Sequence, residues 1–174
     1  TKFQDTNILL SDLVNSESQI MWDRDPLTRV GKVAPWLTLD QDPYPVVVDG
    51  RIKWIVDGYT LSNDFPYASR VSLGEATADS ISGANFAAGL IARDRVNYMR
   101  NSVKAVVDAF EGTVSLYAWD ESDPVLRTWR KAFPDVVEPR ADMPDDVIEH
   151  VRYPQDLFKV QRTVMTRYHV TDAS

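Results

Sequence analysis

The first clear pattern of apolar and polar positions lies between residues 44 and 56. Two apolar runs, 44–48 and 52–56, flank the dipeptide Asp49-Gly50. This dipeptide supplies the positive φ values that a type I′ turn needs. On the second run, Ile52, Trp54 and Val56 fall on one face of a strand, because side chains alternate across a sheet. The pattern predicts a β-hairpin.

A second hairpin is predicted between residues 98 and 119. The segments 98–110 and 113–119 flank Glu111-Gly112, where glycine again allows a positive φ. The first segment, "NSVKAVVDAF", also fits a helix, since Ala, Val and Lys occur in both kinds of element. We favour a strand, because Val103, Val106 and Val107 are β-branched and the facing "TVSLYAW" reads as a strand.

Helical periodicity accompanies an N-terminal signal at several places. Asp25 and Asp123 each precede a proline, which combines a capping side chain with a residue suited to the first helical position. Apolar residues then recur at helical spacing. Helices are predicted over 26–34, 124–132, 141–151 and 153–169, and short helices are considered within 1–22 and near 86–93.

The segment between the two hairpins has a different composition. Residues 71–90 are rich in Ser, Ala, Gly and Asp, with few and small apolar residues, which is typical of a long loop. The chain is therefore predicted to be a single α+β domain over 1–174. It is an antiparallel sheet built from two long β-hairpins with helices packed against it on one face, and a flexible excursion at about 71–90.

Composition narrows the classes of partner. The net charge is −7, with no run of Lys or Arg, so a nucleic acid or an anionic lipid surface is not expected as a partner. With no cysteine, disulfides and thiolate chemistry are absent from this chain. No stretch approaches the roughly 18 apolar residues of a membrane span, and no signal-peptide pattern occurs. The chain begins "TKFQD" without Met, so we expect a fragment of a longer protein.

The two histidines are the first candidates for chemistry. His150 and His169 lie near the ends of predicted helices, where a histidine stabilises the helix C-terminus. The sharper interpretation pairs them with Asp156 or Asp146 in a proton-transfer or metal site. Their 19-residue separation matches no metal-ligand spacing, so neither a metal nor a cofactor is predicted.

Carboxylates are plentiful, and a pair of them could do acid–base chemistry on a sugar. Most precede Pro or Gly or begin a helix, where turns and caps explain them. The "DQDP" segment at 40–43 lacks the length and glycine of a calcium loop. The carboxylates considered are Asp40, Asp42, Asp57, Asp64, Asp120, Asp123, Asp145 and Asp146.

Other motifs point to binding more than to catalysis. Ser62 and Ser102 lack the glycines of a nucleophile elbow, and no glycine-rich phosphate loop occurs. "HVRYPQDLF" is the densest polar and aromatic cluster, which makes Arg152 and Tyr153 the candidate ligand-binding residues. Arg152 could hold an anion, or it could pair with Asp156 four residues later.

Three segments of the chain carry a resemblance to known proteins. They are "SDLVNSESQIMWDRDPLTRVGKVAPWLTLDQDPYPVVVDGRIKWIVDGYTLSNDFPY", "NYMRNSVKAVVDAFEGTVSLYAWDESDPVLRTWRKAFP" and "HVRYPQDLFKVQRTVMTRYHVTD". Together they resemble the UPF0182 family of uncharacterised bacterial membrane proteins. The resemblance implies several N-terminal transmembrane helices followed by a large extracytoplasmic part, of which this chain resembles the first portion. It implies no catalytic or binding residues, because the family has no established activity.

Three functions therefore stand as hypotheses. The leading one is a non-enzymatic extracytoplasmic interaction or binding domain of a polytopic cell-envelope membrane protein. Its partner would be the rest of the parent protein, or an envelope protein or polymer. The second is a hydrolase or transferase acting on envelope glycans or lipids, and the third is a structural or gating domain of a transporter.

Overall fold

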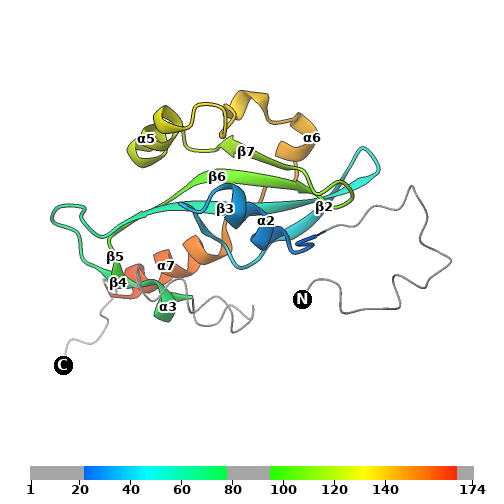
Figure 1. Cartoon of the computed structure of the whole chain (residues 1–174). Helices are drawn as coiled ribbons and strands as arrows, with labels where there is room; N and C mark the ends of the chain where they lie inside the picture. The colour runs from blue at the N-terminus through cyan, green and yellow to red at the C-terminus, as the bar shows by residue number, and fades with distance from the viewer. Residues whose placement is uncertain (1–21, 78–94, 168–174) are drawn as a thin grey trace, which may run out of the picture.

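A twisted antiparallel sheet runs through the middle of the molecule (Figure 1). The computed structural model describes residues 22–77 and 95–167. The main strand order is β1-β3-β6-β7, and β2 also pairs with β3. The strands are β1 (Thr38–Leu39), β2 (Tyr44–Val48), β3 (Arg51–Ser62), β6 (Tyr98–Asp108) and β7 (Val114–Ala118). The α+β class and the antiparallel sheet are as the sequence predicts.

Both predicted hairpins are present. Asp49 and Gly50 have φ values of 54° and 73°, which is the pattern of a type I′ turn, and they join β2 to β3. The second hairpin joins β6 to β7 through a longer turn in which Gly112 has a φ of 71°. The segment from residue 98 is therefore a strand and not a helix.

The two hairpins are joined side by side through β3 and β6, the longest strands of the sheet. Their register runs from Lys53 opposite Asp108 to Ser62 opposite Tyr98, with an irregularity at Gly58 and Tyr59. A Cβ on Gly58 would lie 3.0 Å from a methyl group of Leu37, so glycine allows the loop before β1 to approach the strand closely. The long pairing of β3 with β6 joins the two hairpins into one continuous sheet.

Two helices begin as predicted. The carboxylate of Asp25 accepts the amide N–H of Thr28 at the start of α2 (Pro26–Val33). The carboxylate of Asp123 accepts two amide N–H groups at the start of α5 (Pro124–Ala132). Both helices have proline in the first turn, where no N–H is required.

The helix predicted over 141–151 is wrong in extent. Residues Arg140–Asp142 form the 3-10 helix η2, and only Asp145–Ile148 form α6. Pro144 keeps Met143 in extended backbone, which separates the two turns. In the same way Pro154 disfavours a helical Tyr153, so the last helix, predicted over 153–169, begins two residues later as α7 (Gln155–Thr166).

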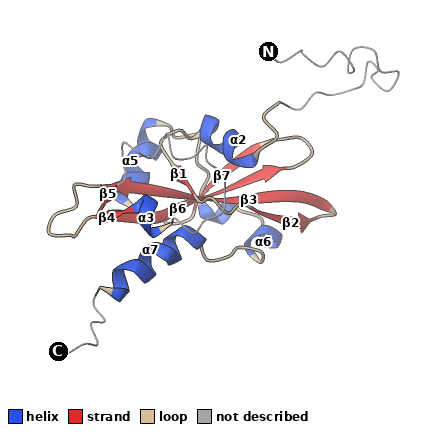
Figure 2. Ribbon diagram, turned by 90° about the horizontal axis from the view of Figure 1, so that it is seen from below, coloured by secondary structure: helices blue, strands red, loops and turns tan. Residues whose placement is uncertain are grey.

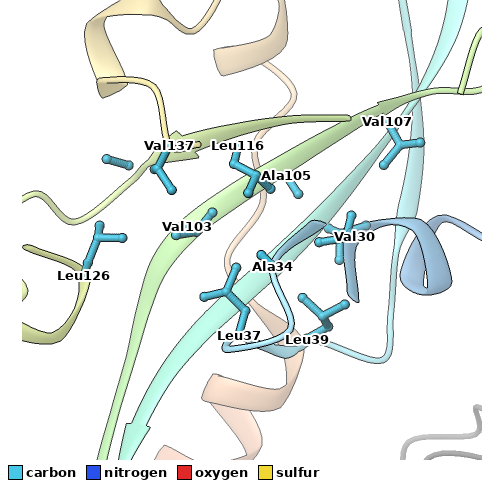
Figure 3. Packing of buried hydrophobic residues seen from close by; sticks show 12 residues of the cluster. Val30, Ala34, Leu37, Leu39, Val103, Ala105, Val107, Leu116, Leu126 and Val137 are labelled. Carbon is cyan, nitrogen blue, oxygen red and sulfur yellow. The ribbon is translucent and has the colours of Figure 1, made fainter. Parts of the chain in front are cut away.

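Helices cover both faces of the sheet, which corrects the expectation of one face (Figure 2). The face beneath α2 and α5 holds a core cluster that includes Val30, Ala34 and Leu126, packed on Val56 and Val103 (Figure 3). The opposite face packs against α6. Its buried residues are Tyr44, Val46, Val48, Ile55, Val106, Tyr117, Met143 and Val147. Apolar side chains alternate on β3 and β6, so each strand contributes to both clusters.

A third cluster lies where α7 meets a small second sheet. It is formed by β4 (Val71–Ser72), α3 (Leu73–Ala76), β5 (Arg95–Val96) and α7. Of the excursion predicted over about 71–90, residues 71–77 thus form β4, α3 and the residue after it, and Val71, Leu73 and Ala76 are buried. Residues 78–90, the helix considered near 86–93 and the helix considered within 1–22 lie wholly or largely outside the described residues.

Candidate functional site

A groove of about 850 Å³ lies on the sheet face that carries α6 and α7. Its floor is β6, and its walls are the segment after β7, the 3-10 helix η2, the extended segment before α7 and the first turns of α7. Arg152 and Tyr153, the candidate ligand-binding residues, both line it. The groove brings together residues far apart in sequence.

An ion pair is buried in the floor of the groove. Lys104 of β6 and Asp57 of β3 are cross-strand neighbours and contact each other directly, with side chains 0% and 4% exposed. The Lys104 ammonium also donates a 3.1 Å hydrogen bond to the carbonyl oxygen of Arg152. Burial raises the pKa of Asp57 and lowers the pKa of Lys104, while their mutual attraction opposes both shifts. The pair links the sheet to the wall of the groove.

Two arginines of the groove lie on aromatic rings. The guanidinium carbon of Arg140 is 4.0 Å from the ring centroid of Trp119, and that of Arg152 is 4.8 Å from the ring centroid of Tyr44. Within the described parts of the chain, no carboxylate oxygen lies within 4.0 Å of either guanidinium. A cation over an aromatic ring is stabilised electrostatically, and this contact leaves its N–H donors available.

A second polar cluster anchors the start of α7 beside the groove. The carboxylate of Asp40 accepts a hydrogen bond from Tyr59 and a 3.0 Å bond from the amide of Asp156. The Tyr59 hydroxyl in turn accepts the amide N–H of Leu157 at 3.3 Å. Burial, reinforced by Asp40, raises the pKa of Tyr59 far above its ordinary value. This cluster satisfies amide groups that a helix leaves open at its N-terminus.

The remaining predicted candidates do not meet in one place. His150 is exposed, and its Nδ1 lies 2.7 Å from the carbonyl oxygen of Asp146. Asp156 is buried and accepts the amide N–H of Gln41 at 3.2 Å. His169 lies outside the described residues. His150 and Asp156 are not among the residues that line the groove.

Most of the carboxylates are engaged by caps, turns or cations. Asp120 lies 3.3 Å from Arg100, and Asp42 donates its amide N–H to Asp40. Asp123 accepts hydrogen bonds from Ser102 and Thr60 on the face opposite the groove. Across residues 22–77 and 95–167, no three His, Cys, Asp or Glu side chains gather as a metal-ligand set.

Among the groove residues that sequence reasoning missed, four are polar or aromatic residues central to the site: Asn101, Lys104, Trp119 and Arg140. Lys104 carried a usable signal, because it is a charged residue inside the valine-rich run "SVKAVVD" of a central strand. A lysine at such a position is rarely buried without a partner. The other three are brought to the groove only by the pairing of β3 with β6 and by the path of residues 119–140.

The fold and the groove define a class of protein: an α+β domain with a cationic and aromatic groove on one face of its sheet. No solved structure matches the chain. The family model of the uncharacterised protein family UPF0182 matches residues 1–174. The chain therefore belongs to the UPF0182 family, as the sequence resemblance indicates.

Similar proteins occur in several bacteria. A UPF0182 protein of Frankia alni is 57% identical over 171 residues, one of Corynebacterium efficiens 57% over 172, and one of Kineococcus radiotolerans 58% over 172. The alignments cover 98–99% of this chain and 17% of each relative. The chain thus spans about a sixth of the length of these relatives. Among the helices that the structure describes, none combines the length and the apolarity needed to cross a bilayer.

Proposed function

We propose that this chain is a non-catalytic binding domain in the extracytoplasmic part of a polytopic cell-envelope membrane protein. One observation carries the proposal: Arg140 and Arg152 lie on aromatic rings at the groove, and their guanidinium groups have no carboxylate partner among the described residues. Such groups are available to a ligand, because the ring contact restricts their motion and leaves their N–H donors unused.

The contacts of the carboxylates favour binding over hydrolysis. A glycosidase needs two carboxyl groups facing each other across a cleft. Asp120 and Glu121 line this groove, but Arg100 and Arg130 lie 3.3 and 3.7 Å from them. Asp57 lies beneath the groove in contact with Lys104. These groups support the walls and floor of a binding site.

Binding is tested with the isotopically labelled chain by NMR. The rest of the parent protein, in detergent, and purified cell-wall material are added separately. We expect chemical-shift changes at amides of the groove, such as those of Asn101, Trp119 and Tyr153, with at least one of the two additions. If neither addition changes these signals, the groove is not a binding site and the proposal fails.

The extracytoplasmic location is tested by labelling. Since the chain has no cysteine, Ser69→Cys at an exposed position gives a single thiol in this region of a parent protein whose other cysteines have been replaced. A membrane-impermeant maleimide should label it in intact cells as fully as in lysed cells. Labelling only after lysis would place the domain on the cytoplasmic side and contradict the proposal.

A further inference from the structure

We infer that the groove binds an acidic glycan, that is, a chain of sugar or polyol units carrying carboxylate or phosphate groups. The inference rests on the proposed binding function and names the chemistry of the ligand. The relevant groups are the donors of Arg140 and Arg152, the acceptor of Asn101 and the exposed ring of Tyr153.

The two arginines define the anionic part of the ligand. A guanidinium presents N–H donors in a planar fork that matches two oxygens of a carboxylate or a phosphate. The guanidinium groups of Arg140 and Arg152 lie over the rings of Trp119 and Tyr44, and this contact restricts their motion without using their N–H donors. Neither is paired with a carboxylate within the described residues. Two separate forks suit a ligand with anionic groups spaced along its length.

The local charge favours an anion in spite of the acidic chain. The whole chain carries −7, whereas among the described residues four cationic and two acidic side chains line the groove, and one of the cations, Lys104, contacts the buried Asp57. The two acidic ones, Asp120 and Glu121, have cations beside them. The overall charge opposes a dense polyphosphate such as nucleic acid, because neutralising many phosphates needs a wide basic surface. A polymer with widely spaced charges interacts mainly with the electrostatic potential of the groove, and less with that of the whole chain.

The other polar groups of the groove suit hydroxyl groups. Asn101 is 9% exposed and donates to Asp57 and Gly58 through its Nδ2, while its Oδ1 accepts no hydrogen bond from the described residues. A buried acceptor without a donor costs free energy. The Oδ1 of Asn101 is closed off from solvent, so a ligand hydroxyl satisfies it only when the Asn101 side chain turns toward the groove.

Tyr153 offers a surface for a sugar ring. Its side chain is 61% exposed, and its hydroxyl donates a 2.7 Å hydrogen bond to Gln161 of α7, which holds the ring in place. The apolar face of a sugar ring packs on such an aromatic ring, while its edge hydroxyls bond to neighbouring polar groups. The groove thus offers a partner for each of three features of an acidic sugar: its charge, its hydroxyl groups and its apolar face.

The test is calorimetric titration of the chain with four probes of similar length. Oligogalacturonate carries carboxylates, an oligomer of glycerol phosphate carries phosphates, maltohexaose is uncharged and oligoglutamate is an acidic peptide. We expect at least one of the two acidic glycan probes to bind about tenfold or more tightly than maltohexaose and oligoglutamate. Which of the two binds identifies the acidic group.

Variants locate the binding. Arg140→Gln and Arg152→Gln should each weaken binding of that probe about tenfold or more, because each removes a charge-assisted pair of hydrogen bonds. Arg127→Gln is the matched control, since Arg127 is exposed on α5, over the opposite face of the sheet, and the same charge is lost. If all three variants weaken binding equally, the loss of affinity comes from the change in net charge and not from the groove, and the inference is wrong.

Two further outcomes are decisive. If oligoglutamate binds through Arg140 and Arg152 and neither glycan does, the ligand is an acidic peptide and the inference is wrong. If all four probes fail while the parent protein or cell-wall material still shifts the groove signals, the inference fails and the proposed function stands. If a variant is too unstable to be folded at the temperature of the titration, the salt dependence of binding to the unchanged chain is measured instead. An affinity that does not change with salt concentration would contradict ionic recognition.

Discussion

Lys104 is the residue on which the groove and the sheet both depend. Its side chain is fully buried in a central strand, where it contacts Asp57, the carbonyl oxygen of Arg152 and the ring of Trp119 at 5.2 Å. A buried charge without its partner is far more costly than an exposed one. Loss of either member should therefore destabilise the chain more than loss of both.

Lys104→Met is expected to lower the free energy of unfolding by about 3–5 kcal/mol, because Asp57 is left as an uncompensated buried charge. The double variant Asp57→Leu/Lys104→Met should recover a substantial part of this loss. Urea denaturation followed by tryptophan fluorescence measures both. Lys53→Met, which changes a half-buried lysine of β3, is the control. Equal destabilisation in the single and double variants would show that the unpaired charge of Asp57 is not the cause of the loss.

Protonation of Asp123 makes the free energy of unfolding of the chain decrease at acid pH. Burial raises the pKa of this carboxyl, but hydrogen bonds from Ser102, Thr60 and Tyr98 outweigh burial, so the pKa lies below its ordinary value. The folded chain therefore favours the ionised form. Its contribution to stability is present above the unfolded-state pKa of about 4 and is lost as the pH falls through the folded-state pKa.

Urea denaturation at a series of pH values tests this dependence. The free energy of unfolding should fall as the pH is lowered from about 5 to about 2, and Asp123→Asn should show a shallower fall. The variant should also be less stable at neutral pH, since its amide nitrogen cannot accept the N–H of Leu126. An unchanged slope in Asp123→Asn would assign the acid sensitivity to other carboxyls.

At the scale of elements, Arg29 ties α2 to the turn between β6 and β7. Its guanidinium donates to the carbonyl oxygens of Gly112 at 2.5 Å, Trp22 at 2.6 Å and Asp23 at 2.7 Å. Gly112 has a positive φ, and a Cβ there would lie 2.2 Å from an Arg29 nitrogen. Gly50 also has a positive φ, but a Cβ there would meet nothing within 4 Å.

Alanine substitutions at the two glycines distinguish the cost of backbone strain from the cost of the steric contact with Arg29. Gly50→Ala should cost about 1–2 kcal/mol of unfolding free energy from the left-handed backbone alone. Gly112→Ala should cost more, because Arg29 must also move and lose hydrogen bonds. In an Arg29→Ala background the cost of Gly112→Ala should fall toward that of Gly50→Ala. Thermal or urea unfolding of the four variants measures this, and an equal cost of Gly112→Ala in both backgrounds would rule out the contact.

The docking of α7 depends on Tyr59. Its hydroxyl bridges the carboxylate of Asp40 and the amide of Leu157. Tyr59→Phe should lower the free energy of unfolding by about 1–3 kcal/mol, because buried groups of Asp40 and Leu157 lose a partner. Amide hydrogen exchange should accelerate in the first turn of α7 more than in β3 and β6. Uniform acceleration across all three elements would mean that α7 does not open on its own.

At the scale of the molecule, one pair of strands serves all three core clusters. Val56 and Val103 belong to the cluster under α2 and α5, Ile55 and Val106 to the cluster under α6, and Leu61 packs on the cluster at α7. No cluster can therefore separate from the sheet without exposing β3 or β6. This sharing predicts that the described part of the chain unfolds as a single unit, and the single domain over 1–174 stays a prediction that unfolding measurements would test.

Unfolding as a single unit can be recognised when two different probes report the same transition. Far-ultraviolet circular dichroism and tryptophan fluorescence should give the same urea midpoint, because Trp36 and Trp54 report on one face and Trp119 on the other. Two distinct midpoints would show that the faces unfold separately.

Features that depend on neighbouring residues were predictable from the sequence, and features that depend on distant residues were not. The turns at Asp49-Gly50 and Gly112 and the caps at Asp25 and Asp123 were predictable, because each depends on a few neighbouring residues. The helix over 141–151 was predicted too long, since apolar spacing suggested a helix where Pro144 interrupts it. Arg152 and Tyr153 were identified as binding candidates from composition, and both line the groove.

By itself the sequence determined the class of fold, the two hairpins, the starts of α2 and α5, and the family. These follow from backbone preferences, turn chemistry and the order of matched residues, all of which are written along the chain. Only the tertiary structure decided the pairing of β3 with β6, the covering of both sheet faces and the groove. Lys104 meets Asp57 and Arg152 across 47 and 48 positions of sequence, and no local rule states that such distant residues will meet.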